Sequence, residues 1–551
     1  MSSSTGTNSH NADAAAIKLL AQPLSFPSGK TAPNRMTKAA MAEMLAHLGG
    51  SPPTQPLLNL YRQWANGGWG MIITGNVAVE RTHLGMPFDI SLPHVPPTPQ
   101  LPRPSPSSQK KPNTSSSSSS SAMWPVSNEY ARLVSRFSTY ADACKPTPEI
   151  QASGTVPTPL AIVQLVHAGR QSIRGFGRAP WSAPLAPSAV SMRTTSALGK
   201  YLGNFIDWLI WSHPREMSKD EIRDVIDQFA ASAKLCADAG FDGVELHASH
   251  GYLLSAFLSP RTNLRQDEYG AGPEGRMRIL VEIVDAVRQR VGPDFVIGVK
   301  LNSSDYLAGG LTEEDALENV RMLAAHGGVD FVEISGGNYE NPSFMGDKFD
   351  ADAERLKAFG QEQQKTPSKR SKAREAFFLS FASRAHETVA AATKGGKKED
   401  RAPMRIIVTG GLKTRAGMAE CVDVGGADGV GLGRAAAVDP HLPLRVLGLE
   451  SDDSSENGQA NGRAGGSGGG AVVGVREYKV PGAGLFAKVP IQVVGAGWAT
   501  LWHTVMLHWL AYASPPSGRH PATRSQPMNM GPLRAFSIVA LGQWAVPKES
   551  E

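Results

Sequence analysis

Two histidines and a tyrosine lie within six residues of one another in the stretch FDGVELHASHGYLLSAFLSPRTN, residues 241–263. They follow a short segment in which apolar and polar residues alternate, as in a buried strand. In parallel α/β proteins, ligands bind at the carboxyl ends of the strands. Imidazole N–H groups can hold a polarised oxygen, and a phenol can deliver a proton. His247, His250 and Tyr252 are therefore candidate catalytic residues.

Glycines end two consecutive expected strands in the later part of the chain: VTGG (408–411) ends one in paired glycines, and GLGR (431–434) ends the next in glycine and arginine. In barrels the loops after strands 7 and 8 commonly bind phosphate, because glycine lets backbone N–H groups approach closely. The arginine can add a bidentate bond, and ISGG (334–337) can supply more amides. One glycine pair alone indicates a tight turn, but two with an arginine favour phosphate. The residues are Gly336, Gly337, Gly410, Gly411, Gly433 and Arg434.

Two further polar side chains stand on expected strands. Gln164 can both donate and accept hydrogen bonds, as the edge of a uracil-like ring requires. Lys300 can place a positive charge beside a ring that becomes anionic on reduction. A buried amide satisfied by the backbone explains Gln164 equally well, and an ion pair across the barrel mouth explains Lys300. The residues themselves leave these alternatives open.

The elements that must position these residues alternate regularly along the chain. The segment at 218–239 is an amphipathic helix with Ser218 as N-cap, Glu221 three residues on, and Gly240 at its end. Eight strand–helix units are the count of a (β/α)₈ barrel, whereas a doubly wound sheet rarely needs so many in one series. The expected strands are 36–41, 70–75, 160–166, 242–247, 295–301, 330–335, 404–409 and 428–433.

Segments of biased composition interrupt or flank the expected barrel, which we place at residues 21–445. Runs of proline, serine or glycine cannot bury enough apolar surface to become ordered. We expect a disordered N-terminus at 1–20, a low-complexity insertion at 93–127, a charged insertion at 346–376, a disordered insertion at 451–475 and a C-terminal extension at 476–551.

An apolar stretch at residues 489–513 carries no formal charge, and its length alone would allow a membrane span. Gln492, His503 and His508 weaken that interpretation, as do interior glycine and threonine residues. We therefore expect a packed terminal helix and no stable membrane association.

The composition limits the classes of function. The net charge of +5 is small for 551 residues and no basic stripe stands out, which argues against nucleic acid as a partner. The isolated Cys144, Cys236 and Cys421 argue against a zinc ribbon, an iron–sulfur cluster and a disulfide framework. The N-terminus shows no basic region followed by an apolar core, so a cytoplasmic location is the default expectation.

Five stretches together carry a resemblance to a known family. They are NRMTKAAM (34–41), QLVHAGRQS (164–172), FDGVELHASHGYLLSAFLSPRTNLRQDEYG (241–270), GVKLNSSDY (298–306), and VTGG followed by DGVGLGRAAAVDP. In these stretches and their order the chain resembles the Old Yellow Enzyme family of FMN-dependent NAD(P)H:flavin oxidoreductases, and more closely its fungal NADH oxidase-like branch. HxxHGYL followed by FLSPxxNxRxDEYG is a long and specific signature.

The resemblance implies a (β/α)₈ TIM barrel that holds FMN non-covalently at its carboxyl end, with NADH or NADPH as reductant. Gln164 would bond the pyrimidine edge of the flavin, and Lys300 would lie near N1 and O2. The backbone of Ala39, Ala40 and Met41 would line the side from the dimethylbenzene ring to N5. The phosphate would be held by Gly410, Gly411, Gly433 and Arg434, with further amides from Gly336 and Gly337.

The resemblance also implies roles for the first three residues. His247 and His250 would bond the carbonyl oxygen of a small α,β-unsaturated substrate, and Tyr252 would be the proton donor of an ene-reductase. The family usually places a threonine or cysteine after KAAM to bond flavin O4, whereas this chain has Ala42. That departure puts the flavin potential and the rate in doubt, but not FMN binding.

Several alternatives remain beside this interpretation. A metal at His247 and His250 would lack a third ligand at a matching strand end. The same fold and cofactor could serve a dehydrogenase, an isomerase or an NADH oxidase in a biosynthetic pathway, and Ala42 suggests a weakly active flavin-binding protein. Scattered cysteines and the lack of a GxGxxG loop after the barrel exclude the larger dienoyl-CoA reductase relatives. Homo-oligomerisation is left open.

Overall fold

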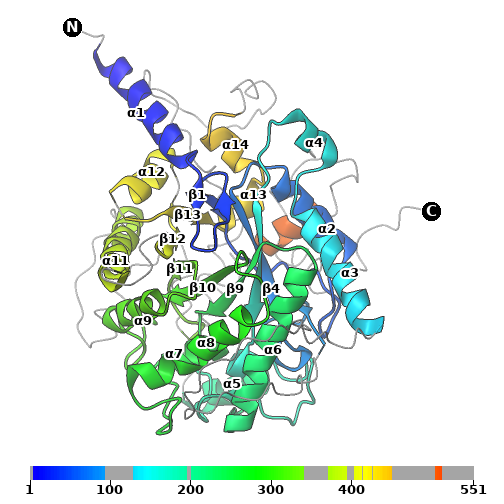
Figure 1. Ribbon diagram of the computed structural model, residues 1–551. Coiled ribbons are helices and arrows are strands. Elements are labelled where there is room, and N and C mark those ends of the chain that lie inside the picture. Colours follow the sequence, from blue (N-terminus) through cyan, green and yellow to red (C-terminus); the bar gives the residue numbers. More distant parts are fainter. Residues whose placement is uncertain are drawn as a thin grey trace, which may run out of the picture.

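Eight parallel strands close into a barrel in the computed structural model of the chain (Figure 1). The structure describes residues 4–93, 128–194, 200–340, 370–393, 402–412, 414–424, 426–449 and 503–511. Pairing of β3 with both β13 and β4 closes the ring. Around the barrel the strands are β3 (Met36–Lys38), β13 (Gly429–Leu432), β12 (Arg405–Thr409), β11 (Phe331–Ser335), β10 (Val296–Asn302), β9 (Gly243–Ala248), β6 (Leu160–Val166) and β4 (Met71–Ala78).

All eight expected strands are present, and the (β/α)₈ prediction is confirmed. The doubly wound alternative is wrong, because an open sheet would leave β3 and β4 unpaired. Seven strands begin or end within a few residues of the expected bounds, and β6 coincides with them. The first expected strand is shortened, since after Lys38 the chain leaves the sheet. The short β5 (Ile90–Ser91) adds to the edge of β4.

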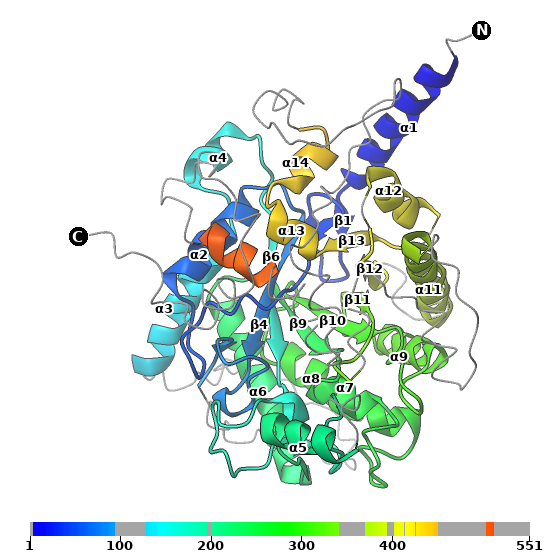
Figure 2. The same ribbon diagram turned by 180° about the vertical axis from the view of Figure 1, so that it is seen from behind.

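Helices surround the barrel, as both views show (Figures 1 and 2). The predicted helix at 218–239 is α6, in which Ser218 Oγ accepts from Glu221 N and Glu221 Oε2 accepts from Ser218 N. Gly240, at φ +89°, follows it. The outer helices are α2 (Gln55–Ala65), α3 (Asn128–Ala143), α6 (Lys219–Asp238), α8 (Gly272–Arg288), α9 (Glu313–His326), α11 (Arg370–Thr393), α12 (Arg415–Asp423) and α13 (Arg434–Val438). Further helices are α4 (Pro148–Ser153), α5 (Lys200–Trp211), α7 (Leu253–Leu258) and α14 (Leu442–Val446).

An apolar plug fills the amino-terminal end of the barrel. The hairpin of β1 (Leu24–Ser25) and β2 (Thr31–Ala32) brings Phe26 against Phe331, with ring centroids 5.8 Å apart. Side chains from the first residues of several barrel strands join these two rings in one buried cluster. The candidate site residues lie toward the opposite end, where the strands finish.

The N-terminal expectation differs from the structure. Residues 1–20 were expected to be disordered, but α1 spans Ser4–Leu20 and lies beside α12 (Figure 1). Ala16 and Leu20 are buried, and Asp13 forms an ion pair with Arg415 at 2.9 Å. The end of this segment, which contains alanine and leucine, forms a helix whose apolar side chains are buried. The serine-rich start of the segment had led to the prediction of disorder.

The other flanking segments lie mostly outside the described residues. This holds for 94–127, for 346–369 and for 451–475, while 370–376 belong to α11. Of the extension at 476–551, residues 503–511 are described and helical.

Leu507, Leu510 and Ala511 of this helix join the main core, and His508 Nε2 lies 3.0 Å from the carbonyl of Glu43. The packed terminal helix is therefore what residues 503–511 form. Within the described ranges, no helix is both long and apolar enough to cross a membrane.

Candidate active site

The turn between β9 and α7 brings the three candidate catalytic residues together at the carboxyl end of the barrel. His247 ends the inward-facing side of β9, His250 lies in the left-handed region at φ +60°, and Tyr252 is the N-cap of α7. The ring of His247 packs edge-on against His250 at 5.2 Å and against Tyr252 at 4.8 Å between centroids. Two imidazoles and a phenol thus form one compact cluster.

Hydrogen bonds indicate which ring nitrogens carry protons. Ser249 N donates to His247 Nδ1 at 3.4 Å, so the proton of a neutral His247 lies on Nε2. That Nε2 lies 3.4 Å from His250 Nδ1. On the other side of the second ring, His250 Nε2 lies 2.9 Å from Ser335 Oγ. Because a hydroxyl can donate or accept, Ser335 allows His250 to present its N–H on either nitrogen.

Burial sets the charge of the cluster. It lowers the pKa of His247 well below its usual value and that of His250 to about 3, so both rings stay neutral at physiological pH. It also raises the pKa of Tyr252 well above its usual value, with contributions from Tyr339 and Asp89. The site therefore holds neutral N–H donors beside a protonated phenol.

A polar layer crosses the barrel interior beneath this cluster. Gln164 Nε2 donates to Glu245 Oε1 at 2.6 Å, and Lys300 Nζ forms an ion pair with Glu333 Oε1 at 2.6 Å. The four residues come from the neighbouring strands β6, β9, β10 and β11. Lys300 does form an ion pair, but with a residue of the adjacent strand in the barrel interior rather than across the barrel mouth. The partner of the Gln164 amide is a carboxyl group rather than the backbone.

The two carboxyl groups of this layer escaped the sequence reasoning. Burial and the neighbouring Glu333 raise the pKa of Glu245. Burial also acts to raise the pKa of Glu333, but Lys300 together with hydrogen bonds from Glu245 and Thr409 outweighs it, and the pKa of Glu333 is lowered. A neutral Glu245 beside the Lys300–Glu333 pair leaves the layer without net charge. Each glutamate is the only Asp or Glu in its otherwise mostly apolar strand, and that pattern was the signal available.

The glycines predicted to bind phosphate lie at the ends of the adjacent strands β12 and β13 and of the next strand, β11. Gly410 and Gly411 follow β12 in left-handed conformations, at φ +111° and +81°. Gly433 follows β13 and caps α13, whose first residue is Arg434. Gly337, at φ +91°, follows β11. The backbone can therefore turn closely around a ligand here without a Cβ in the way.

The segment after β3 runs beside these glycines. Ala39 N donates to the carbonyl of Leu432 at 3.1 Å, and a Cβ built on Gly433 would lie 3.6 Å from Met41 Cγ. Ala40 is partly buried and packs against the apolar cluster inside the barrel. Gly336 is closely covered, since a Cβ there would come within 3.2 Å of the Ser303 hydroxyl. The residues predicted from separate motifs thus meet at one end of the barrel.

This donor set fits FMN. A neutral amide and a paired ammonium group lie in the interior, neutral imidazoles lie above them, and left-handed glycines with an arginine lie to one side. Gln164, Lys300, the glycines and Arg434 would hold the cofactor. The individual contacts remain predictions.

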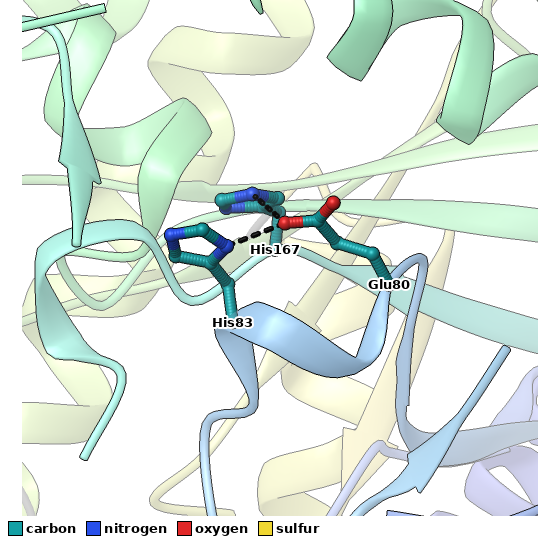
Figure 3. Close-up of side chains that lie close together, drawn as sticks. All are labelled: Glu80, His83 and His167. Carbon is teal, nitrogen blue, oxygen red and sulfur yellow. Dashed lines mark hydrogen bonds and ion pairs between the residues drawn. The ribbon is translucent and has the colours of Figure 1, made fainter. Parts of the chain in front are cut away.

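A second histidine cluster lies at the ends of β4 and β6 (Figure 3). Glu80, His83 and His167 place ligand-type atoms within 4.8 Å of one another, which is the arrangement of a metal site. In the described parts of the chain, no other group of three or more His, Cys, Asp or Glu side chains has this arrangement, and the group includes neither His247 nor His250. The 3₁₀ turn η1 (Arg81–His83) carries His83 next to Glu80.

The hydrogen bonds of this cluster argue against a metal. Leu185 N donates to His83 Nε2 and Gly169 N donates to His167 Nδ1, both at 3.1 Å. The protons therefore lie on the opposite nitrogens, which both donate to Glu80 Oε1. A metal there would shift each proton onto a nitrogen that already faces a backbone N–H. The cluster is a carboxylate clamp that joins two strand ends.

Comparison with known proteins identifies the family of the chain. Residues 149–339 match the model of the NADH:flavin oxidoreductase / NADH oxidase family. An NADH-dependent flavin oxidoreductase of Neonectria sp. (strain DH2) is 37% identical over 77% of this chain, which spans 46% of that protein. A protein of the same description from Hypocrea jecorina (strain QM6a) is 33% identical, covering 77% of this chain and 88% of its own length.

The solved structures show the same fold. An Old Yellow Enzyme homologue from Zymomonas mobilis superposes with a TM-score of 0.51 at 21% identity, covering 78% of this chain and 92% of its own. The chain belongs to the NADH:flavin oxidoreductase / NADH oxidase family, also called the Old Yellow Enzyme family. It is an oxidoreductase, and the family implies FMN as cofactor and NADH or NADPH as reductant, as predicted.

Proposed function

We propose that this oxidoreductase reduces the alkene of a small α,β-unsaturated carbonyl compound, with Tyr252 as proton donor. The observation that carries the proposal is the cluster of two neutral imidazoles and a protonated phenol at the carboxyl end of the barrel. FMN, when bound, supplies hydride transfer between the nicotinamide cofactor and the alkene. Side chains of the protein would stabilise the negative charge on the carbonyl oxygen and donate the proton.

His247 and His250 would stabilise the negative charge that develops on the carbonyl oxygen. His247 already carries its proton on Nε2, the nitrogen that faces His250. For His250 to donate as well, its proton must move to Nδ1, and Ser335 would then donate to Nε2. Neutral donors placed in advance at such an oxygen contribute strongly to catalysis, because they need no reorganisation during the reaction.

Tyr252 would give its hydroxyl proton to the α-carbon of the substrate. Its phenol is protonated over the whole physiological pH range, since burial raises its pKa. Asn76 Nδ2 lies 3.4 Å from the hydroxyl oxygen and can donate to it when it becomes negative. A positioned general acid of this kind speeds such a step by about 10²–10⁴-fold.

Absorbance spectroscopy of the purified protein tests the proposal. A yellow protein that NADH or NADPH bleaches under nitrogen, and that cyclohexenone re-oxidises, would support it. A colourless protein that does not bind added FMN would overturn it.

Ala42 motivates a second candidate, an NADH oxidase or a weakly active flavin-binding protein. Its methyl group cannot donate a hydrogen bond, so a flavin beside it would lack one partner. In that case oxygen consumption with NADH would exceed enone reduction. Ala42→Thr should then raise the enone rate relative to the oxygen rate, and unchanged rates would remove the argument from Ala42.

A further inference from the structure

A buried carboxyl group lies beside the hydroxyl of Tyr252. Asp89 is 3% exposed and directly precedes β5 at the edge of β4. Its Oδ2 accepts from Met86 N at 2.9 Å. Asn76 Nδ2 lies 3.4 Å from Asp89 Oδ2 and 3.4 Å from Tyr252 Oη. One amide group therefore connects the carboxyl group to the phenol.

Gly85 allows these three polar groups to come together. A Cβ built on it would lie 2.9 Å from Tyr252 Oη, 3.0 Å from Asp89 Oδ2 and 3.3 Å from Asn76 Nδ2. Even a methyl group would push against all three atoms. Absence of a side chain at this position keeps the phenol and the carboxyl group close to each other.

Asp89 accepts hydrogen bonds from Met86 N and Asn76 Nδ2, and among the described residues it forms no ion pair with a lysine, arginine or histidine. The titratable groups that face it are Glu43, Tyr252 and Tyr339. Burial raises the pKa of Asp89 to about 7, and Glu43 adds to the effect, while the bonds from Met86 and Asn76 oppose it. The carboxyl group thus changes its charge near neutral pH.

We propose that Asp89 is a charge switch for the proton donor: its neutral form favours proton release by Tyr252, and its ionised form opposes it. The inference rests on the proposed role of Tyr252. When the O–H bond of Tyr252 breaks, its proton goes to the substrate α-carbon and a phenolate remains, which solvent later reprotonates. An ionised Asp89 would repel that phenolate across a water-poor space, and a neutral one would not.

Rapid mixing of the FMN-loaded enzyme separates the two half-reactions. Re-oxidation of the NADH-reduced wild type by cyclohexenone should fall by about tenfold as the pH rises through the titration of Asp89, because the repulsion acts within a low-dielectric site. Asp89→Asn keeps the size of the side chain and removes its charge. It should hold the acid-side rate at all pH values, and it should leave flavin reduction by NADH as in the wild type.

Two variants serve as controls. Asp207→Asn removes another buried aspartate, which lies in α5 and accepts from Thr194. Asp207 is not among the main groups that shift the pKa of Tyr252, so the pH profile of this variant should match the wild type. Gly85→Ala should slow re-oxidation by cyclohexenone and spare flavin reduction, since its methyl group disturbs the connection.

The outcomes separate this inference from the proposed function. If Tyr252→Phe slows re-oxidation but Asp89→Asn keeps the wild-type pH profile, the switch is wrong and the proton donor stands. If Tyr252→Phe leaves re-oxidation unchanged, the proposed function itself fails. A flat wild-type profile across the neutral range would overturn the switch even if Asp89→Asn did not fold.

Discussion

The chain carries two clusters that each join two histidines to an oxygen-bearing side chain, at neighbouring strand ends. In the Glu80 cluster, backbone N–H groups of Leu185 and Gly169 face the far nitrogens of both rings. In the Tyr252 cluster, the far nitrogen of His250 faces the hydroxyl of Ser335. A backbone N–H can only donate, but a hydroxyl can do either. Both histidine protons of the Glu80 cluster are therefore fixed, whereas in the Tyr252 cluster His250 can move its proton from one nitrogen to the other.

This difference separates a structural site from one that can do chemistry. His83 and His167 hold the end of β4 to the end of β6, and the carbonyl of His167 accepts from Leu253 N at the start of α7. The Glu80 cluster thus supports the turn on which Tyr252 lies. Residue types alone would rank it as a metal site, and only the partners of each nitrogen argue against a metal there.

The largest expected effect is that of Tyr252→Phe. Removing the general acid should slow alkene reduction by about 10²–10⁴-fold, while NADH reduces the flavin as before. Stopped-flow measurement of both half-reactions checks this. Equal losses in the two would contradict the proton-donor role.

The next effect compares the histidine pairs directly. His247→Ala with His250→Ala should slow enone reduction by about 10²–10³-fold and abolish the long-wavelength band that phenols give on binding such flavins. His83→Ala with His167→Ala, the matched double variant of the Glu80 cluster, should retain the band. If the band persists without His247 and His250, the carbonyl clamp is misassigned.

Removal of the Ser335 hydroxyl should have a smaller effect. Ser335→Ala deprives His250 of its adjustable partner, so enone reduction should slow about fivefold, the value of one neutral hydrogen bond of about 1 kcal/mol. Ser335→Thr retains a hydroxyl and should recover most of the rate. Steady-state kinetics with cyclohexenone distinguish the two, and equal rates would show that His250 needs no such partner.

Glu80→Gln tests the clamp through stability. Burial raises the pKa of Glu80, but the two histidine donors outweigh it and hold the pKa below its ordinary 4.5. The stabilisation is therefore present above about pH 4.5 and is lost as the pH falls.

Glu80→Gln should lower the free energy of unfolding by about 1–3 kcal/mol at neutral pH and weaken its acid dependence. Urea titrations at two pH values measure this, with the exposed Glu387→Gln as a control that should change little. Wild-type stability in Glu80→Gln would mean that the clamp contributes nothing.

The smallest expected effect is that of added metal. Zn²⁺ or a chelator should leave the thermal midpoint unchanged, because the fixed protons of His83 and His167 exclude a metal. A rise in the midpoint with Zn²⁺ that disappears in Glu80→Gln would show that the cluster binds metal after all.

Much of the barrel could be predicted because its signals are local. The apolar run of β6 and the capping box of Ser218 and Glu221 each depend on a few adjacent residues. The proximity of His247, His250 and Tyr252 was equally predictable, since one turn carries all three. Their assigned roles came from the family resemblance, and these remain proposals.

The contacts that control this site were not visible in the same way. Asn76 and Asp89 meet Tyr252 from 176 and 163 positions away along the chain. Glu245 and Glu333 neutralise the interior layer only because parallel strands bring them level with Gln164 and Lys300. α1 was missed because its apolar end needed a docking partner, α12, that sequence periodicity does not identify.

The amino-acid sequence by itself determined the eight strand–helix units, the family and the three residues of the catalytic turn, because short-range patterns encode them. Only the tertiary structure decided which histidine nitrogens carry protons, which carboxyl groups are neutral and which side chain adjoins the Tyr252 hydroxyl. Those properties depend on burial and on partners supplied by distant strands, and the closure of the barrel creates both.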